Sequence, residues 1–235
     1  MDVTKPSTSW FSPPSKQTTK SSQKNEELYP ALLINKPHIT IVAGAKGSGK
    51  SQLVCRLLLT AYKKVYDEIV FVSPTFHAQV KGLWGKLSPE GIRVVDDLSQ
   101  EFVDSFLIAQ SISTQNTLLI LDDCGQAQRL LKGNSWMKLI ANSRHYKLSI
   151  ISLHQKLTQA DVCLRVNADT IICFPSCSYG ERDALYKARS TVDKKTFMDL
   201  FRRATEENYS FLVCTVRSGN LRFYMSDFTT DITPI

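Results

Sequence analysis

Three glycines lie close together at positions 44, 47 and 49, although the chain of 235 residues has only ten. Their spacing, with the Lys-Ser pair that follows, matches the P-loop pattern G-x-x-x-x-G-K-S. Glycine lets such a loop approach a phosphate closely, so that successive backbone N–H groups point at the anion. We predict that Lys50 reaches the β- and γ-phosphates of a nucleotide and that Ser51 holds Mg²⁺. The predicted phosphate loop comprises Gly44, Ala45, Lys46, Gly47, Ser48, Gly49, Lys50 and Ser51.

The residues on either side of this loop favour a phosphate site over a chance glycine-rich turn. The β-rich run 38–43 precedes the loop, and residues 52–62 have the apolar spacing of a helix. That helix would direct its positively polarised amino end at the same anion.

Two adjacent acids follow an apolar run in the segment TLLILDDC, residues 117–124. At the carboxyl edge of a parallel sheet, where ligands bind, Asp122 would hold Mg²⁺ through water, as a Walker B aspartate does. Asp123 would face the other way and polarise the attacking water. The alternative for an Asp-Asp pair after a strand is a turn or a helix cap.

A polar amide ends a third apolar run, in the segment IISLHQ, residues 150–155. At the same edge of the sheet, Gln155 could hydrogen-bond the γ-phosphate or the attacking water. His154 alternates away from it and is interpreted as structural. The alternative is that Gln155 is an ordinary loop residue.

Strands and helices alternate along most of the chain, which predicts an α/β fold with a parallel sheet covered on both faces. We therefore expect a P-loop NTPase of the RecA/ASCE-like class, with a mainly parallel central sheet flanked by helices and a C-terminal β-hairpin around Ser218-Gly-Asn220. The predicted strands are 39–43, 68–73, 92–95, 117–121, 148–153, 170–174, 210–216 and 221–224. The predicted helices are 50–62, 100–110, 135–144, 159–165, 179–190 and 194–205.

Composition limits the organisation of the chain. Residues 1–27, rich in Ser, Thr, Lys, Gln and Pro, are predicted to be a disordered tail, and residues 28–235 a single P-loop ATPase domain. No apolar run approaches the ~20 residues needed to span a bilayer, and residues 1–24 lack the apolar segment of a signal peptide. These features predict an intracellular protein. The net charge of +7 favours an anionic partner.

Four segments occur in the order GAKGSGKS, LLILDDCG, NSRHYKLSIISLHQKLTQ and LRVNADTIICF. Together they resemble the genome-packaging ATPases of the FtsK–HerA superfamily, and most of all the poxvirus-type packaging ATPases of large DNA viruses, virophages and related mobile elements. The resemblance covers residues 36–216. Its discriminating part is an Arg-His pair before a strand that ends in His-Gln-Lys, followed by Leu-Arg-x-Asn.

The resemblance implies ATP and Mg²⁺ as cofactors. It places Lys50 and Ser51 at the phosphates and metal and Asp122 on Mg²⁺. It makes Asp123 the catalytic acid, where many relatives carry Glu, and Gln155 the γ-phosphate sensor. It also implies a homo-oligomeric ring, pentamer or hexamer, that translocates double-stranded DNA of any sequence into a preformed capsid, at a capsid vertex or portal-type protein. Such a motor works in the host cytoplasm or viral factory, or with the virion.

Arg144 is predicted to close the helix after the acid pair. It can be a favourable charge at a helix carboxyl end, or it can reach across a ring interface to a neighbour's γ-phosphate. Arg165 is placed similarly before the next strand. The candidate DNA contacts are Arg129 and Lys132 after the acid pair, and Lys81 and Lys86 beside Trp84. The alternative for both loops is a solvated surface.

Three other functions fit part of the pattern. A GTPase switch would use Asp122-x-x-Gly125, but no guanine-reading N-K-x-D follows. A nucleotide kinase fits the size, but tandem acids and a polar sensor suit hydrolysis better. A non-packaging DNA motor, such as a helicase or conjugation ATPase, is the serious alternative. DNA-stimulated ATP hydrolysis separates a motor from the first two, and strand separation identifies a helicase.

Overall fold

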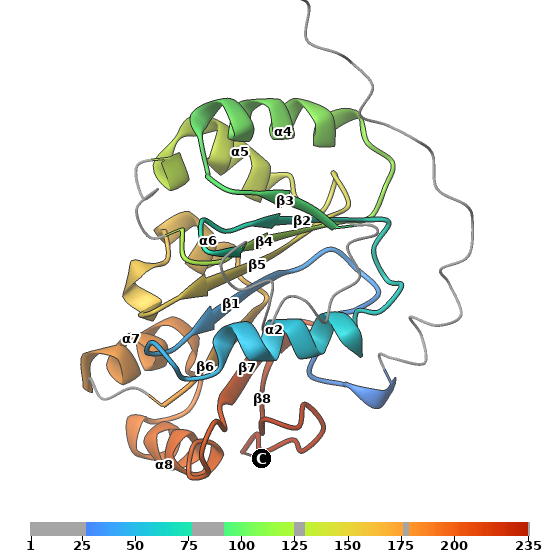
Figure 1. Cartoon of the computed structure of the whole chain (residues 1–235). Coiled ribbons are helices and arrows are strands. Elements are labelled where there is room, and N and C mark those ends of the chain that lie inside the picture. The colour runs from blue at the N-terminus through green and yellow to red at the C-terminus, as the bar shows by residue number, and fades with distance from the viewer. Residues whose placement is uncertain (1–26, 77–91, 125–129, 176–178, 235) are drawn as a thin grey trace, which may run out of the picture.

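The protein is described as a computed structural model that covers residues 27–76, 92–124, 130–175 and 179–234 (Figure 1). The predicted tail up to residue 26, the loop with Lys81, Trp84 and Lys86, and Arg129 lie outside the described residues.

Eight strands of the described chain form one sheet in the order β3-β2-β4-β5-β1-β6-β7-β8. The strands from β3 to β6 in this order are parallel, β7 is antiparallel to β6, and β8 is antiparallel to β7. The strands are β1 (Ile39–Ala43), β2 (Glu68–Val72), β3 (Ile92–Val95), β4 (Thr117–Leu121), β5 (Leu148–His154), β6 (Thr170–Cys173), β7 (Leu212–Arg217) and β8 (Asn220–Tyr224). The prediction of a mainly parallel sheet with a C-terminal hairpin is confirmed.

The central strands form because their sequences are apolar on both faces. Every residue of β1, β4 and β6 is buried, which is typical of parallel strands covered by helices on both sides. The hairpin has a different cause. Ser218 and Gly219 have φ values of 51° and 81° between the paired residues Arg217 and Asn220, so a two-residue turn of type I′ joins β7 to β8.

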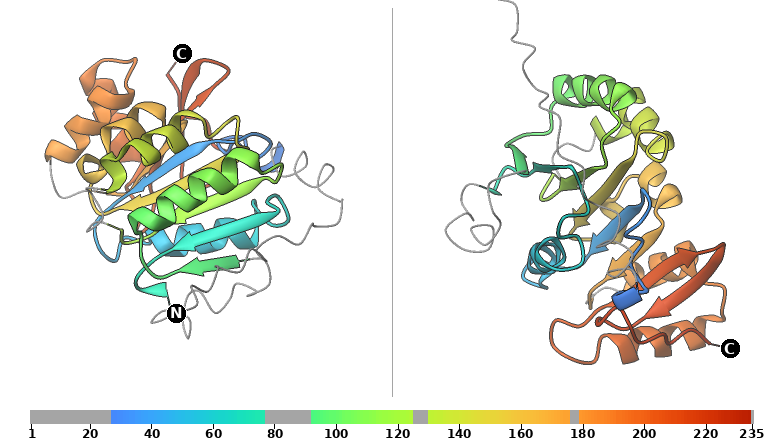
Figure 2. Two further views of the ribbon diagram at one scale, coloured as in Figure 1. Left: turned by 90° about the horizontal axis from the view of Figure 1, so that it is seen from above. Right: turned by 90° about the vertical axis from the view of Figure 1, so that its right-hand side faces the viewer.

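Helices cover the two faces of this sheet unequally (Figures 1 and 2). Helix α2 packs on one face with the segment 31–34, and α4 to α8 pack on the other. The helices are α2 (Lys50–Leu59), α4 (Gln100–Ile112), α5 (Asn134–Ala141), α6 (Val162–Asn167), α7 (Tyr179–Arg189) and α8 (Lys194–Ala204), with short 3₁₀ turns η3 (Leu130–Lys132) and η4 (Leu157–Gln159). No helix in these described segments is long and apolar enough to cross a membrane.

Three predicted helix boundaries were wrong by three residues each. Helix α2 ends at Leu59 and not at residue 62. Helix α5 ends at Ala141, three residues before Arg144, because the chain must turn to enter β5. The Leu148 N–H bonds the Ser143 carbonyl at 2.8 Å, and Lys147 adopts a left-handed φ of 51°. The helix predicted at 159–165 is instead α6, which begins only after Asp161 accepts a capping bond from the Leu164 N–H.

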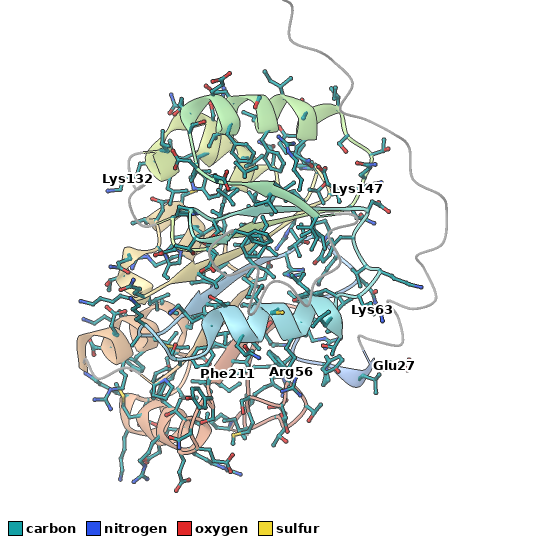
Figure 3. The ribbon with its side chains drawn as sticks, viewed as in Figure 1. Glu27, Arg56, Lys63, Lys132, Lys147 and Phe211 are labelled. Atoms are coloured by element: carbon teal, nitrogen blue, oxygen red, sulfur yellow. The ribbon has the colours of Figure 1, made fainter. Side chains whose placement is uncertain are left out.

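Parallel strands all end at the same edge of the sheet. The loops after β1, β2, β3, β4 and β5 therefore meet there, and this edge is where an open α/β sheet binds its ligand. Figure 3 shows Lys132 at this edge and Lys63 and Lys147 at the opposite one.

Candidate nucleotide-binding site

Each glycine of the loop after β1 meets a specific requirement of the fold. Gly47 and Gly49 have φ values of 80° and 102°, in the left-handed region that favours glycine. Gly44 is needed for close packing instead: a Cβ atom there would lie 2.6 Å from the Ser48 Oγ and 2.7 Å from the Phe174 Cβ. The loop therefore follows the path that a phosphate-binding loop needs, directly before the amino end of α2.

Replacing Gly44 by alanine should destabilise the protein by about 1–3 kcal/mol and weaken nucleotide binding, because Phe174 is held in the core and cannot move aside. Urea unfolding and titration with an ATP analogue measure the two effects. Ala45→Ser, at the exposed neighbouring position, is the control for a change of side chain in this loop. An unchanged unfolding free energy in Gly44→Ala would contradict the close approach to Phe174.

Ser51 and Asp122 meet at the amino end of α2. The Ser51 hydroxyl donates a hydrogen bond to the Asp122 carboxylate at 3.1 Å. Asp122 is only 6 % exposed, and burial raises its pKa, although the bond from Ser51 and the charge of Lys50 oppose that rise. The strand order brings these two oxygens together from positions 71 residues apart.

A magnesium ion fits this pair of oxygens. Carboxylate and hydroxyl oxygens are ligands that Mg²⁺ prefers, and Mg²⁺ is commonly bound by one or two such groups together with phosphates of the substrate. Within the described segments no group of three or more His, Cys, Asp or Glu side chains could hold a metal. The ion would therefore be held by Ser51 and Asp122 only in company with a nucleotide.

Lys50 lies folded over the loop. Its ammonium donates to the carbonyl oxygens of Gly44 and Ala45 at 2.7 and 2.9 Å. Burial lowers the pKa of Lys50, and the negative charges of Asp122 and Asp123 partly offset this effect. A partly desolvated ammonium at this place gains strongly from an anionic partner such as a phosphate.

Asp123 differs from Asp122 in backbone and exposure. It has a left-handed φ of 56°, which aspartate tolerates better than most residues, and its side chain is exposed. The turn separates the two carboxylates, one buried beside Ser51 and the other open to the cleft. This arrangement suits Asp122 to binding a metal ion and Asp123 to contacting a water molecule.

The end of β5 lies beside the phosphate loop. β1 pairs with β5, and the Gly44 N–H bonds the His154 carbonyl at 3.1 Å, which places Gln155 next to the loop. The His154 ring contacts the Ser152 hydroxyl at 2.8 Å. Burial, with the charge of Lys50, lowers the pKa of His154 to about 4, so the imidazole is neutral at pH 7.

These groups surround one cleft of about 780 Å³. Its lining combines the phosphate loop, the acid pair and the end of β5, as the sequence predicts. The lining residues are Lys46, Gly47, Lys50, Ser51, Pro74, Thr75, Asp97, Leu98, Asp122, Asp123, Cys124, Leu153, His154, Gln155 and Gln159.

The family model described as "Poxvirus A32 protein" matches residues 26–220. The chain belongs to the poxvirus A32 protein family. It is also similar to "Uncharacterized protein 075L" of Invertebrate iridescent virus 6, with 26 % identity over 140 residues, or 57 % of this chain. The match spans 53 % of that relative, so this A32-family chain aligns with about half of it.

Solved structures share the fold of this A32-family chain. The genome packaging NTPase B204 of Sulfolobus turreted icosahedral virus 2, in complex with AMPPCP, has a TM-score of 0.58 and 19 % identity over 80 % of this chain and 96 % of that one. The DNA-packaging ATPase B204 of Sulfolobus turreted icosahedral virus has a TM-score of 0.58 and 19 % identity over 80 % and 97 %. The pCW3 conjugation coupling protein TcpA has a TM-score of 0.52 and 15 % identity over 83 % and 61 %.

The predicted arginines lie away from this cleft. Arg144 pairs with the Asp169 carboxylate at 2.8 Å, and its side chain is 74 % exposed. Asp169 also accepts from the Ile39 N–H at 2.9 Å, which places the pair where β1 begins, at the edge opposite the cleft. Arg165 is on α6, and its carbonyl accepts a bond from Arg189 at 3.2 Å. A role for either arginine in a neighbouring subunit stays a prediction.

Sequence reasoning missed several residues of the cleft. Thr75 and Asp97 follow β2 and β3, and the signal that could have found them is a polar residue after a parallel strand. Gln159 comes from η4, where its side chain accepts from the Lys156 N–H at 3.1 Å. The same turn is fixed to α7, because Thr158 donates to the buried Glu181 through its hydroxyl at 2.7 Å and its N–H at 3.3 Å. No local sequence pattern predicts the contact between Thr158 and Glu181.

Proposed function

We propose that this chain is an ATP-driven motor that moves double-stranded DNA into a preformed viral capsid. The observation that carries the proposal is the cleft at the ends of β1, β4 and β5, where a phosphate loop, a buried acid, an exposed acid and the side-chain amide of Gln155 meet. Membership of the A32 family and a fold shared with B204, which is described as a DNA-packaging ATPase, support it.

In this proposal the residues of the cleft divide the work of ATP hydrolysis. The loop N–H groups and Lys50 bind the phosphates, and Ser51 with Asp122 hold Mg²⁺, which neutralises charge on the phosphates when bound. Asp123 orients and deprotonates the attacking water, because its carboxylate is exposed to the cleft. Gln155 hydrogen-bonds the γ-phosphate or that water from the end of β5.

The motor function can be tested directly. Double-stranded DNA of any sequence should stimulate ATP hydrolysis by the purified protein, and the protein should move a blocked DNA end in an ATP-dependent way. In infected cells, loss of turnover should leave capsids without nuclease-protected DNA. A conjugation-type motor would show the first two activities without the third. The conjugation coupling protein TcpA is similar to this chain in fold. Turnover that ignores DNA would contradict any motor.

We propose that Lys132 contacts DNA phosphates, as do Arg129, Lys81 and Lys86 outside the described residues. Lys132 is exposed at the edge where the cleft opens, whereas Lys63 is exposed at the opposite edge (Figure 3). Phosphate contacts are independent of sequence and depend on salt. Lys132→Ala should therefore weaken DNA binding equally for all sequences and flatten its salt dependence, with Lys63→Ala as the control of equal charge.

We further propose a homo-oligomeric ring in which Arg144 acts on the γ-phosphate bound by a neighbour. The Arg144 side chain is 74 % exposed, and Asp169 keeps the Ile39 N–H as a hydrogen-bond donor without it, so Arg144→Ala should remain folded. A trans-acting arginine accelerates hydrolysis about 10³–10⁵-fold. Arg144→Ala should thus lose turnover and keep ATP binding and assembly.

An experiment with mixed subunits distinguishes a trans-acting role of Arg144 from a purely structural one. Arg144→Ala and Lys50→Ala subunits, each inactive alone, should recover some hydrolysis together, because an intact loop can then face an intact arginine. Mixed rings that form and recover nothing would rule out Arg144, and Arg165→Ala in the same assay would then test the other candidate. If Arg144→Ala alone were fully active, Arg144 would have no role in hydrolysis, and its ion pair with Asp169 would be its structural contribution.

A further inference from the structure

A column of buried aromatic rings lies beside the phosphate loop, and an exposed tyrosine lies near it. The rings of Phe174 and Phe211 are 4.9 Å apart, those of Phe211 and Phe228 are 5.4 Å apart, and all three side chains are buried. Tyr209, two residues before Phe211 in the chain, lies at the surface and is 73 % exposed. A Cβ atom built on Gly49 would lie 3.5 Å from the Tyr209 ring, so the ring lies against the last residue before α2.

The topology explains how a residue so late in the chain reaches this loop. β7 is antiparallel to β6, and Leu212 pairs with Cys173, so the residues before β7 lie at the edge where β6 ends. Ser210 fixes the turn there, because its N–H and its hydroxyl both donate to the Glu207 carbonyl, at 3.2 and 2.6 Å. The Tyr209 ring is thus presented from a tight turn.

Tyr209 lies on the opposite side of the phosphate loop from the acids and the glutamine. β4 and β5, which carry Asp122 and Gln155, flank β1 on one side, and β6 and β7 flank it on the other. A nucleotide whose terminal phosphate faces Asp122 and Gln155 across the loop must leave its nucleoside on the side of β6 and β7. Among the described residues, Tyr209 is an exposed aromatic residue that lies beside Gly49 on that side.

The backbone at Tyr209 supports a functional role. Its φ of 63° is left-handed, which is unfavourable for a bulky residue. Phe228 has a similar φ of 64°, but its ring is 5 % exposed and packs on Phe211, so burial compensates for the strain. Tyr209 has no comparable burial. Strained backbone that the surrounding turn holds in place is enriched at ligand-contacting positions.

We infer that the ring of Tyr209 is the platform on which the nucleobase of the bound nucleotide stacks. The inference rests on the proposed nucleotide site and extends it to the nucleoside. Stacking of a base on an aromatic ring requires only the base's π-face, so the platform takes adenine and guanine alike. Removal of such a ring weakens binding by about tenfold.

The test compares a non-hydrolysable ATP analogue with inorganic tripolyphosphate, which has the phosphates and no base. Calorimetric titration with Mg²⁺ should show that Tyr209→Gly binds the analogue about tenfold more weakly and tripolyphosphate as well as the wild type does. Tyr209→Phe keeps the ring and should bind both normally. Because glycine suits a left-handed φ, Tyr209→Gly should melt at no lower temperature than the wild type.

The outcomes distinguish the platform from the site it extends. Normal binding of the analogue by Tyr209→Gly would overturn the platform alone. An equal loss for the analogue and tripolyphosphate would also overturn it, because the ring would then be supporting the loop and not the base. A wild-type protein that binds neither compound would overturn the proposed nucleotide site and the platform with it.

Discussion

Lys50→Ala should abolish ATP turnover, by at least about 10²-fold, while the protein stays folded. In the proposed mechanism the ammonium of Lys50 neutralises the charge of the transferred phosphoryl group. Its present contacts are two carbonyl oxygens of the same loop, and burial lowers its pKa. A lowered lysine pKa means that folding disfavours the charged form. Removing the charge should therefore change the free energy of unfolding only slightly.

Phosphate release measures this prediction, and urea unfolding confirms that the variant is folded. Lys63→Ala, an exposed lysine at the far edge of the sheet, is the control and should keep full turnover. Lys50→Arg retains the charge but changes its shape and position, and it should also be inactive. Turnover in Lys50→Ala close to that of the wild type would remove the loop from the mechanism.

The second large effect is expected at Asp123. Asp123→Asn should bind ATP and Mg²⁺ normally and hydrolyse ATP about 10²–10⁴-fold more slowly, because an amide cannot accept the proton of the attacking water. Asparagine has nearly the same shape as aspartate and also tolerates a left-handed φ, so the turn at 56° is retained. The loss of rate therefore reports the carboxylate and not the backbone.

Asp122→Asn is the matched comparison for Asp123→Asn. Asp122 is buried against Ser51, and its change should weaken Mg²⁺-dependent nucleotide binding itself. Calorimetry with a non-hydrolysable analogue separates the two variants, and single-turnover phosphate release gives the chemical step. Unchanged turnover in Asp123→Asn would exclude that residue as the base.

The sequence alone determined the features that depend on neighbours along the chain. Continuous apolar runs gave the buried strands β1, β4 and β6, because a strand covered on both faces has no polar side. The glycine spacing gave the phosphate loop, since only glycine follows its left-handed turns at low cost. The Ser-Gly pair gave the hairpin for the same reason.

Only the tertiary structure decided which distant residues meet. The end of α5 depends on how the chain enters β5, and the partner of Arg144 is Asp169, which sequence spacing does not indicate. Asp97 reaches the cleft because β3 is parallel to β2 and ends at the same edge of the sheet, and Tyr209 reaches Gly49 because β7 runs antiparallel to β6. Such contacts follow from the pairing of strands far apart in sequence, and local propensity and periodicity contain no information about that pairing.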